Sequence, residues 1–192
     1  MAFLAFTGQE LIYLIILTFA IGYIFSGFIK RPDGPGSYLR TGFNWEDLKF
    51  AIIITAPAII LHEMAHKFTA IAFGLSASFY IWPTGLVFAI FLKLIASPFL
   101  IIAPGYVLIQ QGATTLQNTL IAAAGPASNL VLFLIAHLIL TRAMNLSRIQ
   151  AVGLILTKRI NLLLFVFNML PIPPLDGSHV LGGIIKLISV SL

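Results

Sequence analysis

The sequence predicts an all-α, polytopic membrane protein with about five to six transmembrane helices and a small re-entrant element of strand and loop. Of its 192 residues, 59% are hydrophobic and only 9% are charged, and the mean hydropathy is +1.04. A soluble domain is about 45–50% apolar and ~25% charged, so this chain could not cover its surface with polar groups. The composition excludes soluble enzymes, and the net charge of +5 is typical of Lys and Arg at membrane interfaces rather than of nucleic-acid binding.

Apolar segments of about 20 residues can cross a bilayer as helices, and we expect the first at residues 11–29, which contain no charge. This segment is too long for a signal peptide and lacks the basic start and small-residue cleavage site of one. A polar loop rich in Gly and Pro follows at 30–47. Further helices are expected at the other apolar stretches, 48–73, 118–140, 159–170 and 178–192. The chain is therefore expected to form a single transmembrane domain over residues 1–192.

The apolar segment 86–102 is ambiguous because it contains Lys93 and Pro98. It is flanked by 79–82 and 106–109, which combine aromatic and β-branched residues near Pro and Gly, a pattern typical of short strands. Such a segment either crosses the bilayer or re-enters between two strands, where its non-helical backbone must be buried in protein or line a cavity.

Only six acidic residues occur in the chain, and two of them, Glu63 and Asp176, lie in or beside apolar segments. An ionisable group in such a place is costly unless it is paired or bound to a metal, so both are candidates for function. The other four lie near the N-terminus or in the first loop, where water can solvate them: Glu10, Asp33, Glu46 and Asp47.

Residues 62–66, His-Glu-Met-Ala-His, form an H-E-x-x-H motif in the expected helix 48–73. The spacing places His62 and His66 on one helix face, where they can share one metal ion. Glu63 beside them can hold and deprotonate a metal-bound water. The alternative is a pair of core histidines satisfied by neighbouring carbonyl groups. It would bury two imidazoles and a carboxyl group in lipid without a metal, which is costly.

A catalytic zinc site has three protein ligands and an open position for water, so a third ligand is required. Residues 168–177, Asn-Met-Leu-Pro-Ile-Pro-Pro-Leu-Asp-Gly, supply Asp176. The three prolines end a helix, and Gly177 permits a tight turn that can direct this carboxylate inward. The alternative is a turn at the membrane interface in which Asp176 is solvated.

With these motifs the chain resembles the site-2 protease family of intramembrane zinc metalloproteases, in a compact form without PDZ or CBS domains. The family patterns are H-E-x-x-H at 62–66, Gly-Pro-x-x-Asn at 125–129 and Asn-x-x-Pro-x-Pro-x-Leu-Asp-Gly at 168–177, within a core of residues 52–177. The resemblance implies one zinc ion per chain, ligated by His62, His66 and Asp176. It further implies that Glu63 is the general base and that Asn168 positions the substrate or stabilises the oxyanion.

The positions of the expected ligands also predict helix direction. His62 lies 13 residues after Lys49, and Asp176 lies 17 residues after Arg159, which is about 20 and about 25 Å at 1.5 Å per residue. These ligands reach one depth only if the two helices run parallel, with 118–140 crossing between them. If the segment 86–102 also crossed the bilayer completely, the two helices would run antiparallel. We therefore expect that segment to be re-entrant.

The sequence thus predicts hydrolysis of peptide bonds within or near transmembrane helices of membrane protein substrates, by a multi-pass protein of the cell membrane. An unwound substrate could pair with a strand edge at 80–83 or 106–109, with Tyr106, Val107 and Asn129 as candidate substrate-binding residues. Two alternatives stay open, a membrane metal transporter and a catalytically silent membrane scaffold of the same fold. The oligomeric state and the orientation in the membrane stay open as well.

Overall fold

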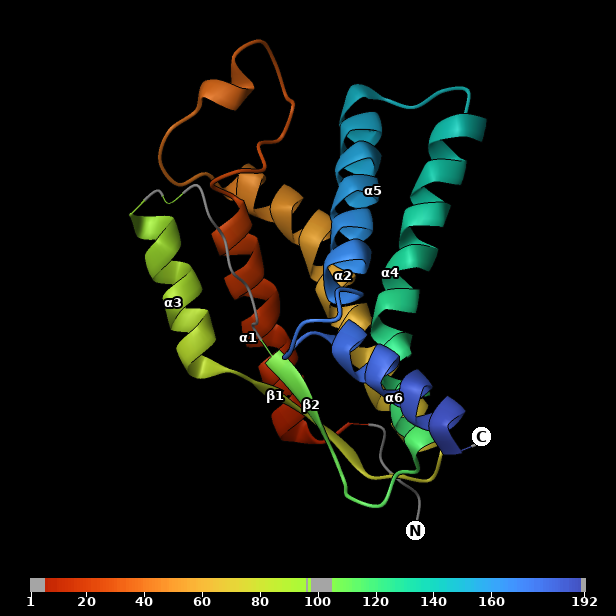
Figure 1. Ribbon diagram of the computed structural model, residues 1–192. Helices are drawn as coiled ribbons and strands as arrows, with labels where there is room; N and C mark the ends of the chain where they lie inside the picture. The colour runs from red at the N-terminus through yellow and green to blue at the C-terminus, as the bar shows by residue number, and fades with distance from the viewer. Residues whose placement is uncertain (1–5, 96, 98–104, 191–192) are drawn as a thin grey trace.

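The computed structural model describes residues 6–95, 97 and 105–190, which form six α-helices, one short 3-10 helix and two strands (Figure 1). The elements follow in the order α1 (Gly8–Phe25), η1 (Ser37–Leu39), α2 (Trp45–Ala72), β1 (Ala77–Ile81), α3 (Pro83–Leu94), β2 (Gly105–Ile109), α4 (Thr115–Arg142), α5 (Arg148–Asn168) and α6 (Asp176–Val190). The predicted class, helical with one small strand element, is confirmed.

Four helices in the described part of the chain, α1, α2, α4 and α5, are long and apolar enough to cross a membrane. The other two, α3 and α6, have 12 and 15 residues. A helix rises about 1.5 Å per residue, so neither reaches across a hydrocarbon core of ~30 Å. The six helices therefore comprise four candidate spans and two shorter apolar helices, where the sequence suggested five to six spans.

Side-chain caps explain where several helices begin. Thr7, Thr114 and Ser147 each open a capping box, in which the cap and the third helical residue exchange side-chain hydrogen bonds. The box at Ser147 starts α5 well before the expected residue 159. Two basic residues thus enter the helix, and one of them, Lys158, places its Nζ 5.9 Å from the centre of the Phe133 ring on α4.

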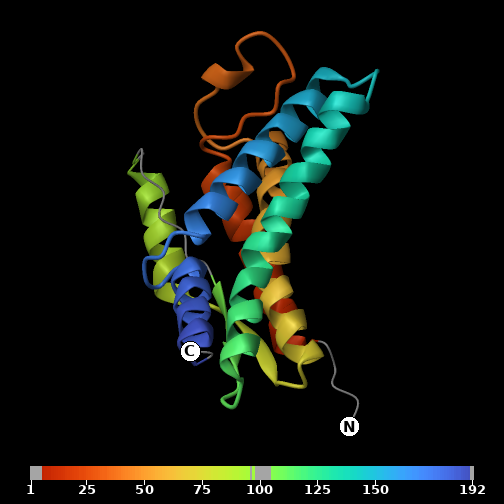
Figure 2. The same ribbon diagram turned by 45° about the vertical axis from the view of Figure 1, so that its right-hand side comes forward.

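The central bundle consists of α2, α4 and α5, with α4 in contact with α2, α5 and α6. Both views show α2 and α5 running in the same direction and α4 running against them (Figures 1 and 2). This is the arrangement that the ligand spacing requires. α1 packs against another side of α2, β1 contacts both of these helices, β2 contacts α2, and α3 lies against α1.

The two strands expected on either side of α3 form one antiparallel hairpin. Ala77 lies opposite Ile109 at its open end, and Ile81 lies opposite Gly105 at the end from which α3 departs. The chain therefore leaves and rejoins the hairpin at the same level. Of the segment expected to re-enter, 86–102, residue 96 and residues 98–102 lie outside the described residues.

We expect cysteines placed at Ser76 and Gln111 to be labelled by an impermeant thiol reagent from the same side of the membrane. Ser76 precedes β1 and accepts a hydrogen bond of 2.9 Å from the N–H of Gln110, which follows β2. Met144, which is 95% exposed between α4 and α5, provides the control and should be labelled from the opposite side. The chain contains no cysteine, so each single variant reports one position. Labelling of Ser76 and Gln111 from opposite sides would show that the segment between them crosses the bilayer.

Candidate metal centre and active site

The two histidines of α2 face the same point. Their Nε2 atoms are 3.2 Å apart, and both rings are buried. The Nδ1 of His62 donates to the Oδ1 of Asn129 at 2.7 Å, and the Nδ1 of His66 donates to the carbonyl oxygen of Ile121 at 2.7 Å. Each acceptor is an oxygen, so Nδ1 carries the proton and Nε2 presents a free lone pair. This is the tautomer in which a histidine binds a metal.

Asp176 joins these imidazoles from the other end of the sequence. Its Oδ2 lies 3.1 Å from the Nε2 of His62 and 3.4 Å from the Nε2 of His66. The ligand atoms of all three side chains lie within 4.8 Å of one another. Two neutral imidazoles and one carboxylate are a donor set that suits zinc with a further position left for water. The residues present therefore fit a catalytic zinc ion.

The turn between α5 and α6 brings Asp176 to this point. After α5 ends at Asn168, the prolines of residues 171–174 prevent its continuation, and α6 starts at Asp176 itself. The chain then doubles back so closely that a Cβ at Gly177 would lie 2.3 Å from the carbonyl oxygen of Met169. Glycine is therefore required here for close packing inside the first turn of α6, whereas the turn itself, which the sequence analysis placed at Gly177, is formed by the residues before Asp176.

Gly125 brings the backbone of α4 against the two imidazoles. A Cβ built at this position would lie 2.3 Å from the Nε2 of His66 and 2.7 Å from the Nε2 of His62, closer than any real Cβ contact. The absence of a side chain therefore leaves free the space toward which the lone pairs point. The Gly-Pro-x-x-Asn segment thus contributes two features to the site, since Asn129 holds His62 and Gly125 leaves this space open.

Glu63 and Asn168, the other expected site residues, are both half-buried. Glu63 lies directly after His62 on α2, and its carboxyl group interacts electrostatically with His62, His66 and Asp176. Asn168 is the last residue of α5. Within the described residues, no hydrogen bond connects Asn168 to the three clustered side chains, and its expected role with substrate stays a prediction.

Asn129 is fully buried, and its polar atoms are already occupied. Its Oδ1 accepts from His62, and its Nδ2 donates to the carbonyl oxygen of Ala58 at 2.9 Å and to the Oδ1 of Asn161 at 3.0 Å. This side chain is thus enclosed between α2, α4 and α5. These contacts support a positioning role for Asn129 behind His62, and its expected contact with substrate stays a prediction.

Asn161 is a member of the site that the sequence analysis missed. It lies on α5, is fully buried, and links Asn129 to the carbonyl oxygen of Thr157, to which its Nδ2 donates at 2.8 Å. One chain of hydrogen bonds thus runs from α5 through α4 to His62 on α2. The available signal was an amide side chain in the middle of an apolar helix, where an unsatisfied polar group is costly.

We expect Asn161→Leu to weaken zinc binding by about 10-fold, within the 10–100-fold that outer hydrogen-bond partners of metal ligands contribute. Loss of Asn161 leaves one Nδ2 proton of Asn129 without its acceptor, so Asn129 can rotate away from His62. Zinc affinity measured by chelator competition checks this, and Asn145→Leu in the exposed α4–α5 loop is the matched control. Equal zinc affinities for both variants would contradict the positioning role.

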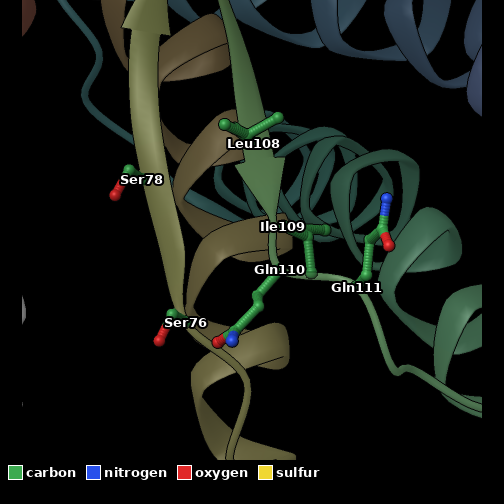
Figure 3. Close-up of a pocket in the computed structure, with 6 residues that line it drawn as sticks. All are labelled: Ser76, Ser78, Leu108, Ile109, Gln110 and Gln111. Carbon is green, nitrogen blue, oxygen red and sulfur yellow. The ribbon is translucent and has the colours of Figure 1, made fainter.

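The remaining candidates, Tyr106 and Val107, lie on β2 with opposite orientations. Val107 packs inward on the cluster that contains Ile59 and Met64 of α2, which places β2 beside the histidine-bearing turn. Tyr106 points outward, is 48% exposed and stacks on Tyr80 with ring centres 5.8 Å apart. The open end of the hairpin borders a cavity of about 550 Å³, whose polar lining residues are Ser76, Ser78, Gln110 and Gln111 (Figure 3).

A buried ion pair fixes the hairpin to the helices. Lys67 of α2 and Glu10 of α1 are both buried and form an ion pair. The same Glu10 carboxylate accepts the N–H of Phe79 in β1 at 2.7 Å. The Glu10 carboxylate thus holds α1 and β1 against α2. Its partner Lys67 directly follows His66.

Comparison with curated proteins gives two relatives. The chain is 35% identical over 184 residues to "Putative zinc metalloprotease MJ0611" of Methanocaldococcus jannaschii, covering 94% of this chain and 87% of that protein. It is 36% identical over 78 residues to "Putative zinc metalloprotease YwhC" of Bacillus subtilis, covering 36% of each chain. No protein-family model and no solved structure matches the chain. Since the first similarity extends over nearly the whole of both chains, this protein belongs to the same family as the M. jannaschii protein of that name.

Proposed function

We propose that this protein is an intramembrane zinc metalloprotease of the site-2 type, which hydrolyses peptide bonds within or near transmembrane helices of protein substrates in the cell membrane. The observation that carries this proposal is the convergence of His62, His66 and Asp176 inside a bundle of membrane-length helices. Both curated relatives are named for zinc-dependent proteolysis. The combination supports peptide hydrolysis at a site surrounded by lipid-facing helices.

In the proposed reaction, the protein side chains hold the metal and move the proton. His62, His66 and Asp176 would ligate zinc, which when bound polarises the scissile carbonyl group and acidifies water. Glu63 takes a proton from the attacking water and later returns it to the leaving amine. The positions of the ligands are fixed by Asn129 and by the Ile121 carbonyl, so little reorganisation is needed during the reaction.

The hairpin offers one free edge to an extended substrate. Gln110 pairs with Ser76 by a backbone hydrogen bond. Because hydrogen-bonded pairs alternate along an antiparallel ladder, the pair Phe79 and Val107 directs its backbone groups outward. On the β1 side, the outward N–H of Phe79 is taken by Glu10. In the part of the chain that the structure describes, no such partner covers Val107 on β2, so this edge is the one proposed to pair with an unwound substrate segment.

The distribution of ligand groups favours an enzyme over a metal transporter. A transport path across the bilayer needs several layers of metal-binding side chains along its length. Among the described residues, one group of three His or acidic side chains is close enough to hold a metal. A catalytically silent scaffold needs no general base, whereas this chain retains Glu63 next to His62.

We expect the purified protein to bind one zinc ion per chain, and Asp176→Asn or His66→Ala to weaken this binding by more than about 100-fold. Changes to outer hydrogen-bond partners alone cost 10–100-fold, and these variants remove a ligand. His179→Ala, an exposed histidine three residues beyond Asp176, is the matched control and should bind zinc normally.

The same preparation tests the function through cleavage of a single-helix membrane substrate in detergent. A chelator should abolish cleavage, and added zinc should restore it. Zinc binding without any cleavage of membrane-embedded substrates would contradict the proposed protease. Absence of bound zinc in the wild-type protein would contradict the metal site itself.

A further inference from the structure

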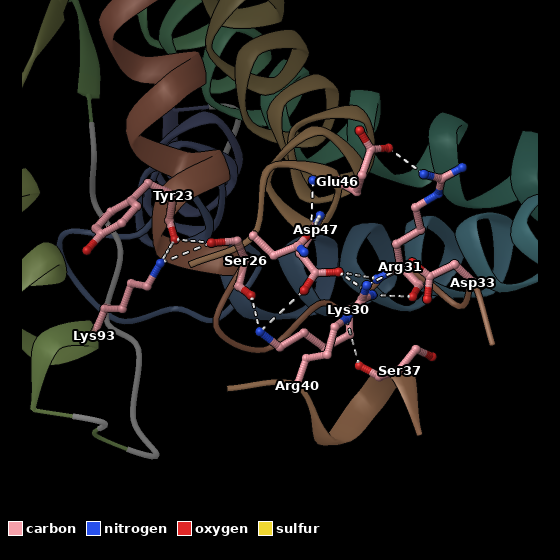
Figure 4. Close-up of polar contacts among 11 residues, drawn as sticks. Tyr23, Ser26, Lys30, Arg31, Asp33, Ser37, Arg40, Glu46, Asp47 and Lys93 are labelled. Carbon is pink, nitrogen blue, oxygen red and sulfur yellow. Dashed lines mark hydrogen bonds and ion pairs between the residues drawn. The ribbon is translucent and has the colours of Figure 1, made fainter. Parts of the chain in front are cut away.

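At the end of the bundle where α1 ends and α2 begins lies a second cavity, of about 490 Å³. It is bordered by the last turns of α1 and α3 and by the loop that leads to α2, with Tyr23, Ser26, Lys30, Arg40, Phe43 and Lys93 among its lining residues. Figure 4 shows the polar side chains of this region. None of its described lining residues lies on α2, α4 or α6, which carry the side chains of the proposed active site.

The charges around this cavity do not balance. Asp47 is fully buried, accepts from Arg40 at 2.8 Å and from the N–H of Arg31 at 2.8 Å, and lies 3.6 Å from the Nζ of Lys30. Asp33 binds Arg40 at 2.7 Å, and this hydrogen bond lowers the pKa of the Asp33 carboxyl group below its ordinary value. Four basic side chains thus meet three acidic ones, the sets being Lys30, Arg31, Arg40 and Lys93, and Asp33, Glu46 and Asp47.

Lys93 is the cation that this network leaves without an acidic partner among the described residues. Its ammonium group is half-buried, donates to the carbonyl oxygen of Tyr23 and to the Oγ of Ser26 at 3.0 Å, and lies 3.5 Å from the centre of the Tyr23 ring. Lys30 donates to the carbonyl oxygen of the same Ser26 at 3.0 Å. Two ammonium groups therefore converge on one residue, and each retains an N–H for a further acceptor.

Arg40 differs from these lysines because its guanidinium group is already used. It donates to Asp33, to Asp47 and to the carbonyl oxygens of Arg31 and Ser37. It therefore shapes the cavity wall, whereas Lys93 has no acidic partner among the described residues and Lys30, beside Asp47, keeps one N–H for an anion inside the cavity.

The surroundings place this cavity at a membrane surface. The loop beside it exposes large aromatic side chains, with Tyr38 70% and Trp45 64% exposed and Phe43 on the cavity wall. Tyr and Trp at such positions are typical of the headgroup layer of a bilayer. Away from the cavity, α1 and α3 expose apolar side chains such as Phe19 and Phe91, against which acyl chains can lie.

We propose that this cavity binds the phosphate of an anionic phospholipid headgroup, held by the ammonium groups of Lys93 and Lys30 with its acyl chains along α1 and α3. A basic pocket between membrane helices is a known means of headgroup recognition. A phosphate would supply the negative charge that the described side chains around Lys93 lack. A free phosphate ion has the same charge but gains nothing from the apolar surfaces beside the cavity.

The test is native mass spectrometry of the full-length protein in detergent, with phosphatidylglycerol and phosphatidylcholine as probes. We expect phosphatidylglycerol to be retained at least about five-fold more than phosphatidylcholine. This ratio corresponds to the attraction of one basic side chain to an anionic lipid. Lys93→Gln should remove this preference and Lys93→Arg should keep it. The matched controls are Lys49→Gln, which lies at the same end but is exposed and paired with Glu46, and Lys186→Gln on α6.

An equal loss in the Lys93 and Lys49 variants would indicate unspecific surface attraction and would overturn the proposal. Displacement of phosphatidylglycerol by millimolar inorganic phosphate would assign the cavity to the free ion and overturn the lipid assignment. If Lys93→Gln does not fold, a photoactivatable phosphatidylglycerol decides the question on the wild-type chain. Cross-links must then map to the loop near Phe43 or to the end of α3, and cross-links elsewhere alone would refute the site.

Discussion

Glu63→Gln is expected to retain bound zinc and to lose peptide cleavage by about 10²–10⁴-fold, the contribution that a general base usually makes. The substitution keeps the size of the side chain and leaves His62, His66 and Asp176 unchanged. It removes the carboxylate that accepts the proton of the attacking water. Because Glu63 makes no hydrogen bond to the three clustered side chains within the described residues, its loss should not disturb their geometry.

The contrast with a ligand variant separates the base from the metal site. Asp176→Asn keeps Glu63 but should lose zinc, so both variants are inactive and only one retains metal. Glu46→Gln, at the exposed start of the same helix, is the control and should behave as wild type. The measurement is the cleavage rate of one detergent-solubilised membrane substrate at matched zinc occupancy. Equal rates for wild type and Glu63→Gln would defeat the proposed mechanism.

The histidine pair and the hairpin could be predicted from the sequence because local spacing determines both. A separation of four residues places His62 and His66 on one helix face whatever the rest of the fold does. Likewise, aromatic and β-branched residues near Pro and Gly predicted strands on either side of α3, and both strands are present. The parallel direction of α2 and α5 followed from a physical requirement, because ligands on two helices share a metal only at one depth.

Contacts between distant segments could not be predicted in this way. The link from Asn161 through Asn129 to His62 joins three helices, and no sequence periodicity reveals which buried amide meets which. The Glu10–Lys67 pair was equally hidden, because Glu10 lies near the N-terminus, where water appeared able to solvate it. The start of α5 was placed too late because Lys158 and Arg159 interrupt the apolar pattern, although long basic side chains can extend toward a membrane interface or an aromatic ring.

The second large effect concerns Gly125, whose role became visible only in the structure. Gly125→Ala is expected to reduce zinc affinity by more than about 100-fold, beyond the range of outer hydrogen-bond partners. The new methyl group would lie 2.3 Å from the Nε2 of His66 and 2.7 Å from the Nε2 of His62. It would occupy the space toward which both lone pairs point, or force α4 away from α2 and carry Asn129 with it.

Gly153→Ala on α5 makes the same change where there is room, since its Cβ would meet the Phe50 ring at 3.6 Å, an ordinary contact. Alanine favours a helix over glycine by roughly 0.5–1 kcal/mol, so the control should bind zinc normally and melt at an equal or higher temperature. The helix preference is the same at Gly125, so any loss there reports the crowding of the imidazoles and not a weaker helix. Wild-type zinc affinity in Gly125→Ala would show that α4 can yield without moving the histidines, and the close approach of α4 would then have no part in building the metal site.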